Sequence, residues 1–366
     1  MDPADFRAAF PVFERVAYLN AGTDGPVPRA GIEAAGARMA HELERGRSGR
    51  EHFQGLVELN ERRRELLAGL LGCAADEVAL THSTTDGVNV VLGGLDLRAG
   101  DEVLTSDEEH PGLLAPLAAA RDRRGVEISQ APFRELASAL RPGTRLVATS
   151  HVSWLSGQVL DASSLKAAGV PLLLDGAQGL GAVPVDVREL GCDFYAASGQ
   201  KWLCGPDGTG CLYVRAERLE DITPGWFGYP TLQDPTDALT SPLRPDGRRL
   251  DLGFVPGSAA AWSLAALEFL AEAGWGWVHA RAAELAGRLA DMLSEGGLEV
   301  HPRGRSTLVS WRDDDCEATS ARMGESGVVV RFIPGSGLVR ASVGAWNDDE
   351  DLARLVELAT TSSSSR

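Results

Sequence analysis

Between residues 77 and 216, short apolar segments alternate with single stretches of helical pattern. The apolar segments are EVALTH, EVLTS, TRLVATSHV, VPLLLDGA, FYAASG and CLYVRA, and the first three precede the helical patterns TTDGVNVVLGGL, GLLAPLAAARDRRG and DASSLKAAG. Strands separated by single helices form a mainly parallel sheet, because each crossover helix returns the chain in the same direction and covers one face. The pattern therefore predicts an α/β fold whose mainly parallel sheet carries helices on both faces.

The composition changes after a segment rich in proline and glycine at 223–257. Two longer helical patterns follow, and then the strand patterns TLVSWR, VVVRFI and LVRASVG and a last helix, DDEDLARLVELA. We predict a large domain over 18–256 and a smaller α+β domain formed by 1–17 and 257–366. The tail at 360–366 is polar and of low complexity, a composition typical of disorder.

The charge and the cysteines restrict the partners. The formal net charge of -17 at pH 7 argues against nucleic acid and against an anionic membrane surface, since both require clustered cations. No apolar run is long enough to span a bilayer, and the start MDPADFRAAF lacks the plan of a signal peptide. The five cysteines have no metal-ligand spacing, which predicts reduced thiols and no metal site. We expect a cytoplasmic protein that acts on a small molecule.

Lysine is almost absent from the chain. Only two of the 35 basic residues are lysine, Lys166 and Lys201. Arginine stays charged, whereas a desolvated lysine can lose its proton and act as an amine nucleophile. Lys201 lies between an apolar run and a glycine-rich turn in SGQKWLCGPDGTG, and this context makes it the candidate for chemistry. Lys166, in SSLKAAG, has the pattern of a surface charge.

Polar residues follow five of the predicted strands, and ligands of an open parallel sheet bind at the carboxyl ends of its strands. These residues are Thr84, Thr85, His110, His151, Ser153, Asp175, Gln178, Ser198, Gln200 and Lys201. Taken singly, several have structural alternatives, because Thr84 and Asp175 could cap helices and His110 could be an exposed loop residue. Together they place an amine, a carboxylate, an imidazole and hydroxyls at one edge. Pyridoxal phosphate requires this set of groups.

With these residues the chain resembles the class V aminotransferase (cysteine desulfurase-like) family of fold-type I pyridoxal phosphate enzymes. The resemblance extends from YLNAGTDGPVP to VRASVGAWNDDEDLARLV. It implies catalytic roles for three residues: Lys201 forms the Schiff base, Asp175 is the partner of the pyridine nitrogen, and His110 stacks on the ring. It also implies that Gln178 lies near the ring oxygen. The phosphate would be bound by Thr84, Thr85, Ser198 and Gln200.

The family also completes its phosphate site with a segment of the partner subunit. The sequence FVPGSAAAW matches that segment and contributes Gly257 and Ser258. The resemblance therefore implies a homodimer with shared active sites.

Three positions depart from the family pattern. Gln200 stands where the family usually has histidine, so this side chain can donate a hydrogen bond but cannot carry a positive charge. Trp154 replaces an asparagine that desulfurases often have near the cofactor, and we expect it at the substrate. Desulfurases place a cysteine on a loop before the last strands, and ESGVVVRFIPGSGLVRAS contains none; Cys316 lies too early. These departures disfavour persulfide chemistry at a loop cysteine.

The sequence VVVRFI-PGSG-LVRASV predicts a hairpin with its turn at Pro334–Gly337. If Ile333 pairs with Leu338, Arg331 lies directly opposite Arg340. Two opposed arginines repel by a few tenths to about 1 kcal/mol, and a bound carboxylate would offset this because it matches the guanidinium fork. A register slipped by one residue would instead place the arginines on opposite faces as surface charges. The family resemblance also implies that both bind the substrate carboxylate.

Within the family, the segments HPG, SHVSWLSGQVL and DGAQGLGAVPVD are most similar to cyst(e)ine C–S lyases, and next to isopenicillin N epimerase-like proteins. The resemblance implies β-elimination from cystine or an S-substituted cysteine, with Lys201 removing the α-proton. Transamination and epimerisation remain open, because they share the same carbanion. A third interpretation, a cofactor-binding protein without catalysis, is disfavoured by the presence of both Lys201 and Asp175.

Overall fold

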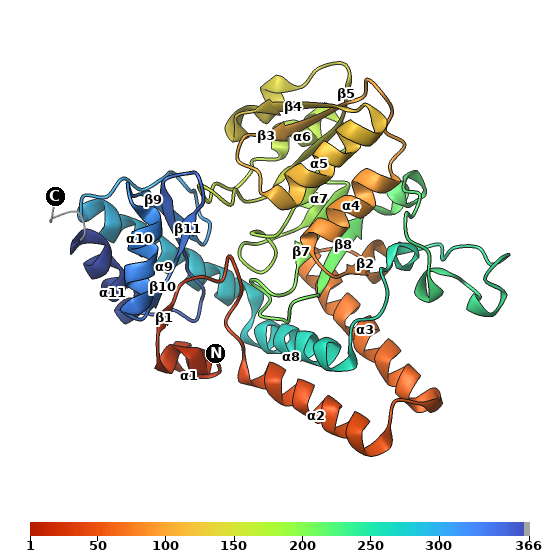
Figure 1. Cartoon of the computed structure of the whole chain (residues 1–366), viewed down its shortest axis with the longest axis horizontal. Coiled ribbons are helices and arrows are strands. Elements are labelled where there is room, and N and C mark those ends of the chain that lie inside the picture. Colours follow the sequence, from red (N-terminus) through yellow and green to blue (C-terminus); the bar gives the residue numbers. More distant parts are fainter. Residues whose placement is uncertain (362–366) are drawn as a thin grey trace.

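The computed structural model describes residues 1–361, and within them a seven-stranded sheet forms the centre of the larger part of the molecule (Figure 1). Its strands are β2 (Val78–Thr81), β3 (Glu102–Ser106), β4 (Glu127–Ala131), β5 (Thr144–Ser150), β6 (Leu172–Asp175), β7 (Phe194–Ser198) and β8 (Gly210–Val214), in the order β2-β8-β7-β6-β5-β3-β4. Neighbours from β7 to β4 pair in parallel, and β8 is antiparallel to both of its neighbours. The predicted α/β class and mainly parallel sheet are confirmed.

Both faces of this sheet are buried by helices. These include α3 (Gly49–Leu71), α4 (Thr84–Gly94), α5 (Pro111–Arg124), α6 (Ser163–Ala168), α7 (Val187–Leu190) and α8 (Gly257–Ala273), and α2 (Arg29–Arg45) packs on α8. Along β6, Leu173 belongs to the apolar cluster that contains residues of α4 and α5, and Leu174 belongs to the opposite cluster with residues of α3. Because successive side chains of a strand point to opposite faces, a continuously apolar strand serves both clusters.

The helices α2 and α3 were not predicted from the sequence. Helix α2 buries only Gly31 and Ala35, so its apolar stripe is too narrow to produce a clear helical period. Gly31 is required by close packing, since a Cβ there would lie 2.3 Å from Cδ1 of Trp262 on α8. Tertiary contact with α8 therefore determines a helix that the local pattern leaves unmarked.

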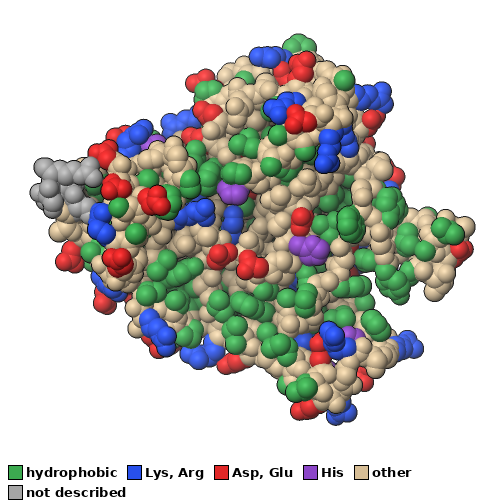
Figure 2. All heavy atoms as spheres, viewed as in Figure 1, with side chains coloured by type: hydrophobic (Ala, Val, Ile, Leu, Met, Phe, Trp, Pro, Cys, Tyr) green, Lys and Arg blue, Asp and Glu red, His purple; other side chains and the backbone are tan. Residues whose placement is uncertain are grey.

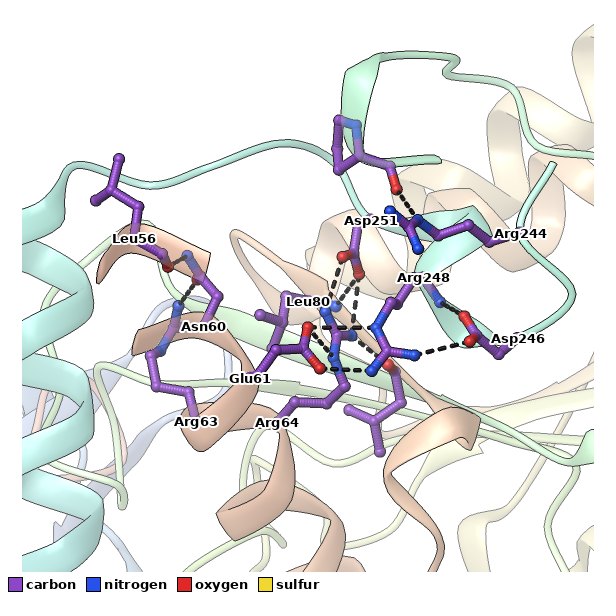
Figure 3. Close-up of polar contacts among 12 residues, drawn as sticks. Leu56, Asn60, Glu61, Arg63, Arg64, Leu80, Arg244, Asp246, Arg248 and Asp251 are labelled. Atoms are coloured by element: carbon purple, nitrogen blue, oxygen red, sulfur yellow. Dashed lines mark hydrogen bonds and ion pairs between the residues drawn. The ribbon is translucent and has the colours of Figure 1, made fainter. Parts of the chain in front are cut away.

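An ion-pair network fixes α3 against β2, the strand that leads to α4 (Figure 3). Arg64 is 1% exposed and donates to Asp251 over 2.8 Å, while the backbone N–H of Leu80 donates to the other carboxylate oxygen. Burial raises the pKa of Asp251, and the charge of Arg64 opposes that rise. Arg248, three residues before Asp251, pairs with Glu61 of α3. Asp251 therefore joins α3, β2 and the segment that leads into α8.

The smaller part of the molecule contains a three-stranded antiparallel sheet in the order β11-β12-β9. Its elements are β9 (Leu308–Arg312), β11 (Arg331–Ile333), β12 (Leu338–Ser342), α9 (Trp275–Glu295), α10 (Cys316–Glu325) and α11 (Asp349–Thr361), with α1 (Pro3–Ala8) nearby and β1 (Ala17–Tyr18) paired in parallel with β10 (Val328–Val329). The predicted VVVRFI strand is thus two short strands. No helix of the described chain is long and apolar enough to cross a membrane.

The domain division at residues 18 and 257 remains our proposal. In that division α8 connects the two domains, because it packs on α2 and α3 while its Ala266 and Leu270 share an apolar cluster with Phe6 and Trp346. The predicted disordered tail begins too early, since residues 360–361 belong to α11. The rest of that tail, 362–366, lies outside the described residues.

Candidate active site

The carboxyl ends of β5, β6 and β7 lie side by side and bring Asp175 near Lys201. Asp175 is the last residue of β6, is 5% exposed and is paired with Ser150 of β5 and Ala196 of β7. Burial raises the pKa of its carboxyl group, and a 2.9 Å hydrogen bond from the N–H of Ala177 and the charge of Lys201 oppose the rise. Burial lowers the pKa of Lys201 to about 8, and Asp175 opposes that change. The two groups therefore act on each other's charge.

Gln178 is fixed at both ends of its amide. Its Nε2 donates to the backbone O of Gly22 over 2.7 Å, and its Oε1 accepts from Nε1 of Trp202 over 3.0 Å. A Cβ at position 22 would lie 2.9 Å from that oxygen, so glycine permits the close approach. The amide thus joins an N-terminal loop to the turn after Lys201.

The start of α4 is joined to the end of β7 through Ser198. Its Oγ accepts from the N–H of Thr84 over 2.9 Å and lies 2.7 Å from Oγ1 of Thr84. Thr85 follows, and its Oγ1 would lie 2.6 Å from a Cβ at Gly112, in the first turn of α5. Two helix starts therefore converge beside the turn that carries Lys201. Helix N-termini favour anions, because their free N–H groups carry partial positive charge.

His110 caps α5 and lies against Trp154. Its Nδ1 accepts from the N–H of Gly112 over 2.9 Å, and its ring centre lies 4.8 Å from that of Trp154 at an interplanar angle of 87°. Burial, together with the charges of Lys201, Arg331 and Arg340, lowers the pKa of His110 to about 4. The imidazole is therefore uncharged at neutral pH, with its proton on Nε2.

The predicted arginine pairing is confirmed. Arg331 of β11 lies opposite Arg340 of β12, and Ile333 lies opposite Leu338, so the register is not slipped. Arg340 is 1% exposed, and burial together with the charge of Arg331 lowers its pKa to about 9. Its Nη1 donates to the backbone O of Trp154 over 2.8 Å. No carboxylate within residues 1–361 forms an ion pair with either arginine, so both charges are available to a ligand.

Several polar atoms around this group are buried and unpaired. Among the described residues, Oε1 of Gln200, Nε1 of Trp154, Nε of Arg340 and Oγ of Ser342 have no hydrogen-bond partner. Native proteins pair nearly all such atoms. A cluster of unpaired atoms beside an amine, a buried carboxylate and a helix start fits a polar ligand with an anionic group, as pyridoxal phosphate is.

Gly257 and Ser258 lie elsewhere in the chain. They begin α8, and a Cβ at Gly257 would lie 2.8 Å from Oε1 of Glu42 and 2.9 Å from Nε of Arg38, both on α2. No contact described within residues 1–361 joins them to Lys201. Their predicted role through the partner subunit remains a prediction.

The sequence patterns missed the loop Gly22–Gly25 as a wall of the site. Oγ1 of Thr23 accepts from Nη1 of Arg331 over 3.0 Å, and the N–H of Gly25 donates to the backbone O of Gln200 over 2.7 Å. The glycines in YLNAGTDGPVP were the available signal, because glycine permits close backbone approach. His151, another strand-end candidate, is a buried packing residue whose Nδ1 lies 3.0 Å from the hydroxyl of Tyr195.

Comparison with known proteins identifies the family. The family model "Aminotransferase class-V" matches residues 17–355. The isopenicillin N epimerase of Streptomyces clavuligerus is 31% identical over 310 residues, which cover 76% of this chain and 75% of the relative. Cysteine desulfurase CsdA of Escherichia coli (strain K12) is 31% identical over 327 residues, which cover 83% and 79% of the two chains.

Solved structures agree with the sequence relatives. The cystine C–S lyase C-DES in complex with cysteine persulfide superposes with a TM-score of 0.91 and 28% identity over 96% of this chain and 99% of that chain. CsdA of Escherichia coli superposes with a TM-score of 0.86 and 26% identity over 100% and 99%. The sheet topology, the strand-end site and these similarities together show that the chain belongs to the class V aminotransferase family and is a pyridoxal phosphate-dependent enzyme of fold type I.

Proposed function

We propose that the protein is a C–S lyase that eliminates a sulfur leaving group from the β-carbon of cystine or an S-substituted cysteine. The environment of its cysteines carries this proposal. Burial raises the pKa of Cys73, Cys192, Cys204 and Cys211, and Cys316 begins α10. A desulfurase needs a thiolate that attacks the substrate sulfur. A lyase needs no such thiolate, because the sulfur departs with the electron pair of the Cβ–S bond.

The residues of the site fit the cofactor. When bound, pyridoxal phosphate supplies a ring that accepts the electron pair left by the departing α-proton. Asp175 would hold the ring nitrogen, Gln178 the ring oxygen and His110 the ring face. The hydroxyl and amide groups at the helix starts would hold the phosphate: those of Thr84, Thr85, Ser198 and Gln200. Oε1 of Gln200 is unpaired in the protein alone, which leaves its amide free to reorient toward this anion.

The amino-acid substrate would be held by its carboxylate between Arg331 and Arg340. Lys201 would then take the α-proton, and its pKa of about 8 makes an uncharged amine available near neutral pH. Trp154, whose backbone O accepts from Arg340, would close one side of the substrate pocket. Because its pKa is lowered, His110 would contact the ring as a neutral imidazole and add no positive charge to the site.

A product assay tests the function. L-cystine and S-substituted cysteines are each incubated with the purified holoenzyme, and pyruvate, ammonia and released sulfur are measured. We expect pyruvate and ammonia in equal amounts, with cystine turned over faster than cysteine because a persulfide is a better leaving group than hydrosulfide. Each single cysteine-to-alanine variant should retain this activity. Alanine as the product would indicate a desulfurase.

The same assay distinguishes the runner-up reactions. A keto acid that forms only with an added amino acceptor would indicate transamination. Loss of optical activity without pyruvate would indicate an epimerase, the activity named for the relative from Streptomyces clavuligerus.

Arg331 and Arg340 form the proposed carboxylate site, the arginine clamp, and replacing either should give a specific kinetic defect. In Arg331→Ala we expect KM for the amino acid to rise about 10- to 100-fold, because a hydrogen bond to a charged group contributes about 1.5–3 kcal/mol. Arg340→Ala should have the same effect. Because Arg340 is buried, its loss can also destabilise the fold, so the thermal unfolding of this variant is measured together with its kinetics. Arg312→Ala is the control, because Arg312 ends β9 and pairs with the exposed Glu299. An unchanged KM in Arg331→Ala would contradict the clamp.

We also propose a homodimer with shared active sites and a cytoplasmic location. Large apolar side chains are exposed on α2 and α3 and on the projecting segment between β8 and α8, where Figure 2 shows hydrophobic spheres at the surface. They are Ile32, Met39, Leu43, Phe53, Val57, Trp226, Phe227, Tyr229, Leu239 and Phe254. A subunit interface would cover them, and it would lie beside Gly257 and Ser258. An active monomer in sedimentation experiments would contradict the dimer.

The unpaired cysteines agree with a reducing compartment.

A further inference from the structure

The loop Gly22–Gly25 runs along the site from the arginine clamp to the lysine. A Cβ at Gly22 would lie 3.0 Å from Nη2 of Arg340, and Thr23 accepts from Arg331 over 3.0 Å. The N–H of Gly25 donates to the backbone O of Gln200, one residue before Lys201. Asp24 therefore occupies the stretch of this wall between the clamp and the lysine.

The carboxylate of Asp24 is exposed and has no partner in residues 1–361. Only its backbone forms hydrogen bonds: the N–H donates to the backbone O of Asn20 over 3.2 Å, and the backbone O accepts from the hydroxyl of Tyr18 over 2.9 Å. Partial burial and the neighbouring Asp207 raise the pKa of Asp24, whereas the charges of Lys201 and Arg331 lower it. The field of both cations thus reaches this carboxylate, although neither forms an ion pair with it.

The charges of the site are arranged in order of depth. Arg340 is buried, Arg331 is half-buried, and Asp24 and Asp207 are exposed, so the two acids lie nearer to the solvent than the two arginines do. A substrate that is complementary to this arrangement has a carboxylate at its reacting end and a cation at its far end. The second half of cystine carries such an ammonium group beyond the disulfide, beside a second carboxylate, whereas a disulfide of cysteine with an amine-bearing thiol has the distal cation alone.

We propose that Asp24 is a specificity-determining residue that binds a cationic group at the far end of the leaving group. This inference rests on the proposed lyase function. In the reaction the α-proton passes to Lys201, the electron pair of the Cα–H bond forms a Cα=Cβ bond, and the Cβ–S bond breaks with its electron pair leaving on sulfur as a persulfide anion. The distal ammonium takes no part in these bond changes, so Asp24 acts on substrate choice and not on the chemical step.

Mixed disulfides of L-cysteine test the inference, because they share one leaving-group chemistry and differ in distal charge. The disulfide with cysteamine carries an ammonium, that with ethanethiol carries no charge, and that with 3-mercaptopropionate carries a carboxylate. We expect the holoenzyme to favour the cysteamine over the ethanethiol disulfide about three- to tenfold in kcat/KM, the range of a partly exposed charge pair. Asp24→Asn should reduce that ratio to about one, and Asp24→Lys should favour the carboxylate.

The ratio between substrates is the decisive quantity. Asp24 also influences the charge of Lys201, and any such effect changes all three disulfides equally and cancels in the ratio. Glu295→Gln is the control, since it removes an equal charge from the exposed end of α9 and should leave the ratio unchanged. If Asp24→Asn retains the preference while pyruvate still forms, the role of Asp24 is wrong and the lyase function stands. If no disulfide yields pyruvate with the wild-type enzyme, both are wrong.

Discussion

Replacing Lys201 with alanine is expected to lower kcat by at least about 10³-fold, because the variant loses both the amine nucleophile and the base that takes the α-proton. The lysine side chain occupies a position with little access to bulk water, and this burial lowers the pKa of Lys201 to about 8. Bulk water therefore cannot supply an equivalent base at the same position. The cofactor should still bind in part, since the groups expected to hold its phosphate and ring remain.

Reductive labelling checks the same residue directly. Borohydride treatment of the holoenzyme should fix the cofactor on the peptide that contains Lys201. The other lysine is a natural control, because Lys166 is exposed and its Nζ donates to the backbone O of Arg188 and Glu189 over 3.1 and 3.0 Å. Lys166→Ala should retain both label and activity. A label on Lys166, or none, would overturn the assignment of Lys201.

The strand-end residues could be predicted from the sequence because they depend on short-range rules. An apolar strand followed by a polar residue places Asp175 and Ser198 at one edge of a parallel sheet, whichever helices cover it. The pairing of Arg331 with Arg340 depended only on the length of one turn. Each of these predictions required knowledge of one strand and the residues that follow it.

Other features depend on contacts that no local pattern contains. Strand β4 was missed because its sequence, EISQA, contains no apolar run and only its last residue is buried. Strand β8 is antiparallel because the link from Ser198 to Gly210 is too short for the crossover that a parallel strand requires. The position of Asp24 follows from the bond between Thr23 and Arg331, which lie 308 residues apart. The position of such a residue can be predicted from the sequence only when the position of its distant partner is already known.

Replacing Asp175 with asparagine is expected to lower kcat by about 10²- to 10³-fold, the usual cost of removing one group that stabilises charge in the transition state. Asparagine has nearly the same volume and can still accept the N–H of Ala177, but it cannot balance a positive charge on the ring nitrogen. Steady-state kinetics measure the loss. Asp161→Asn is the matched control, because Asp161 is an exposed acid whose carboxylate, like that of Asp175, accepts a nearby backbone N–H, here that of Ser163. Normal turnover in Asp175→Asn would refute the assignment.

The same substitution should not destabilise the cofactor-free protein. Burial raises the pKa of Asp175 in the folded state, so the folded chain binds this proton more tightly than the unfolded chain does. The charged carboxylate therefore opposes folding at pH values above its unfolded pKa, and this unfavourable contribution disappears only as the pH falls below that value. At neutral pH, thermal unfolding of cofactor-free Asp175→Asn should occur at the wild-type temperature or above it. A variant that is inactive and no less stable would separate the two roles of this residue, because a carboxylate retained for packing alone would show the opposite result.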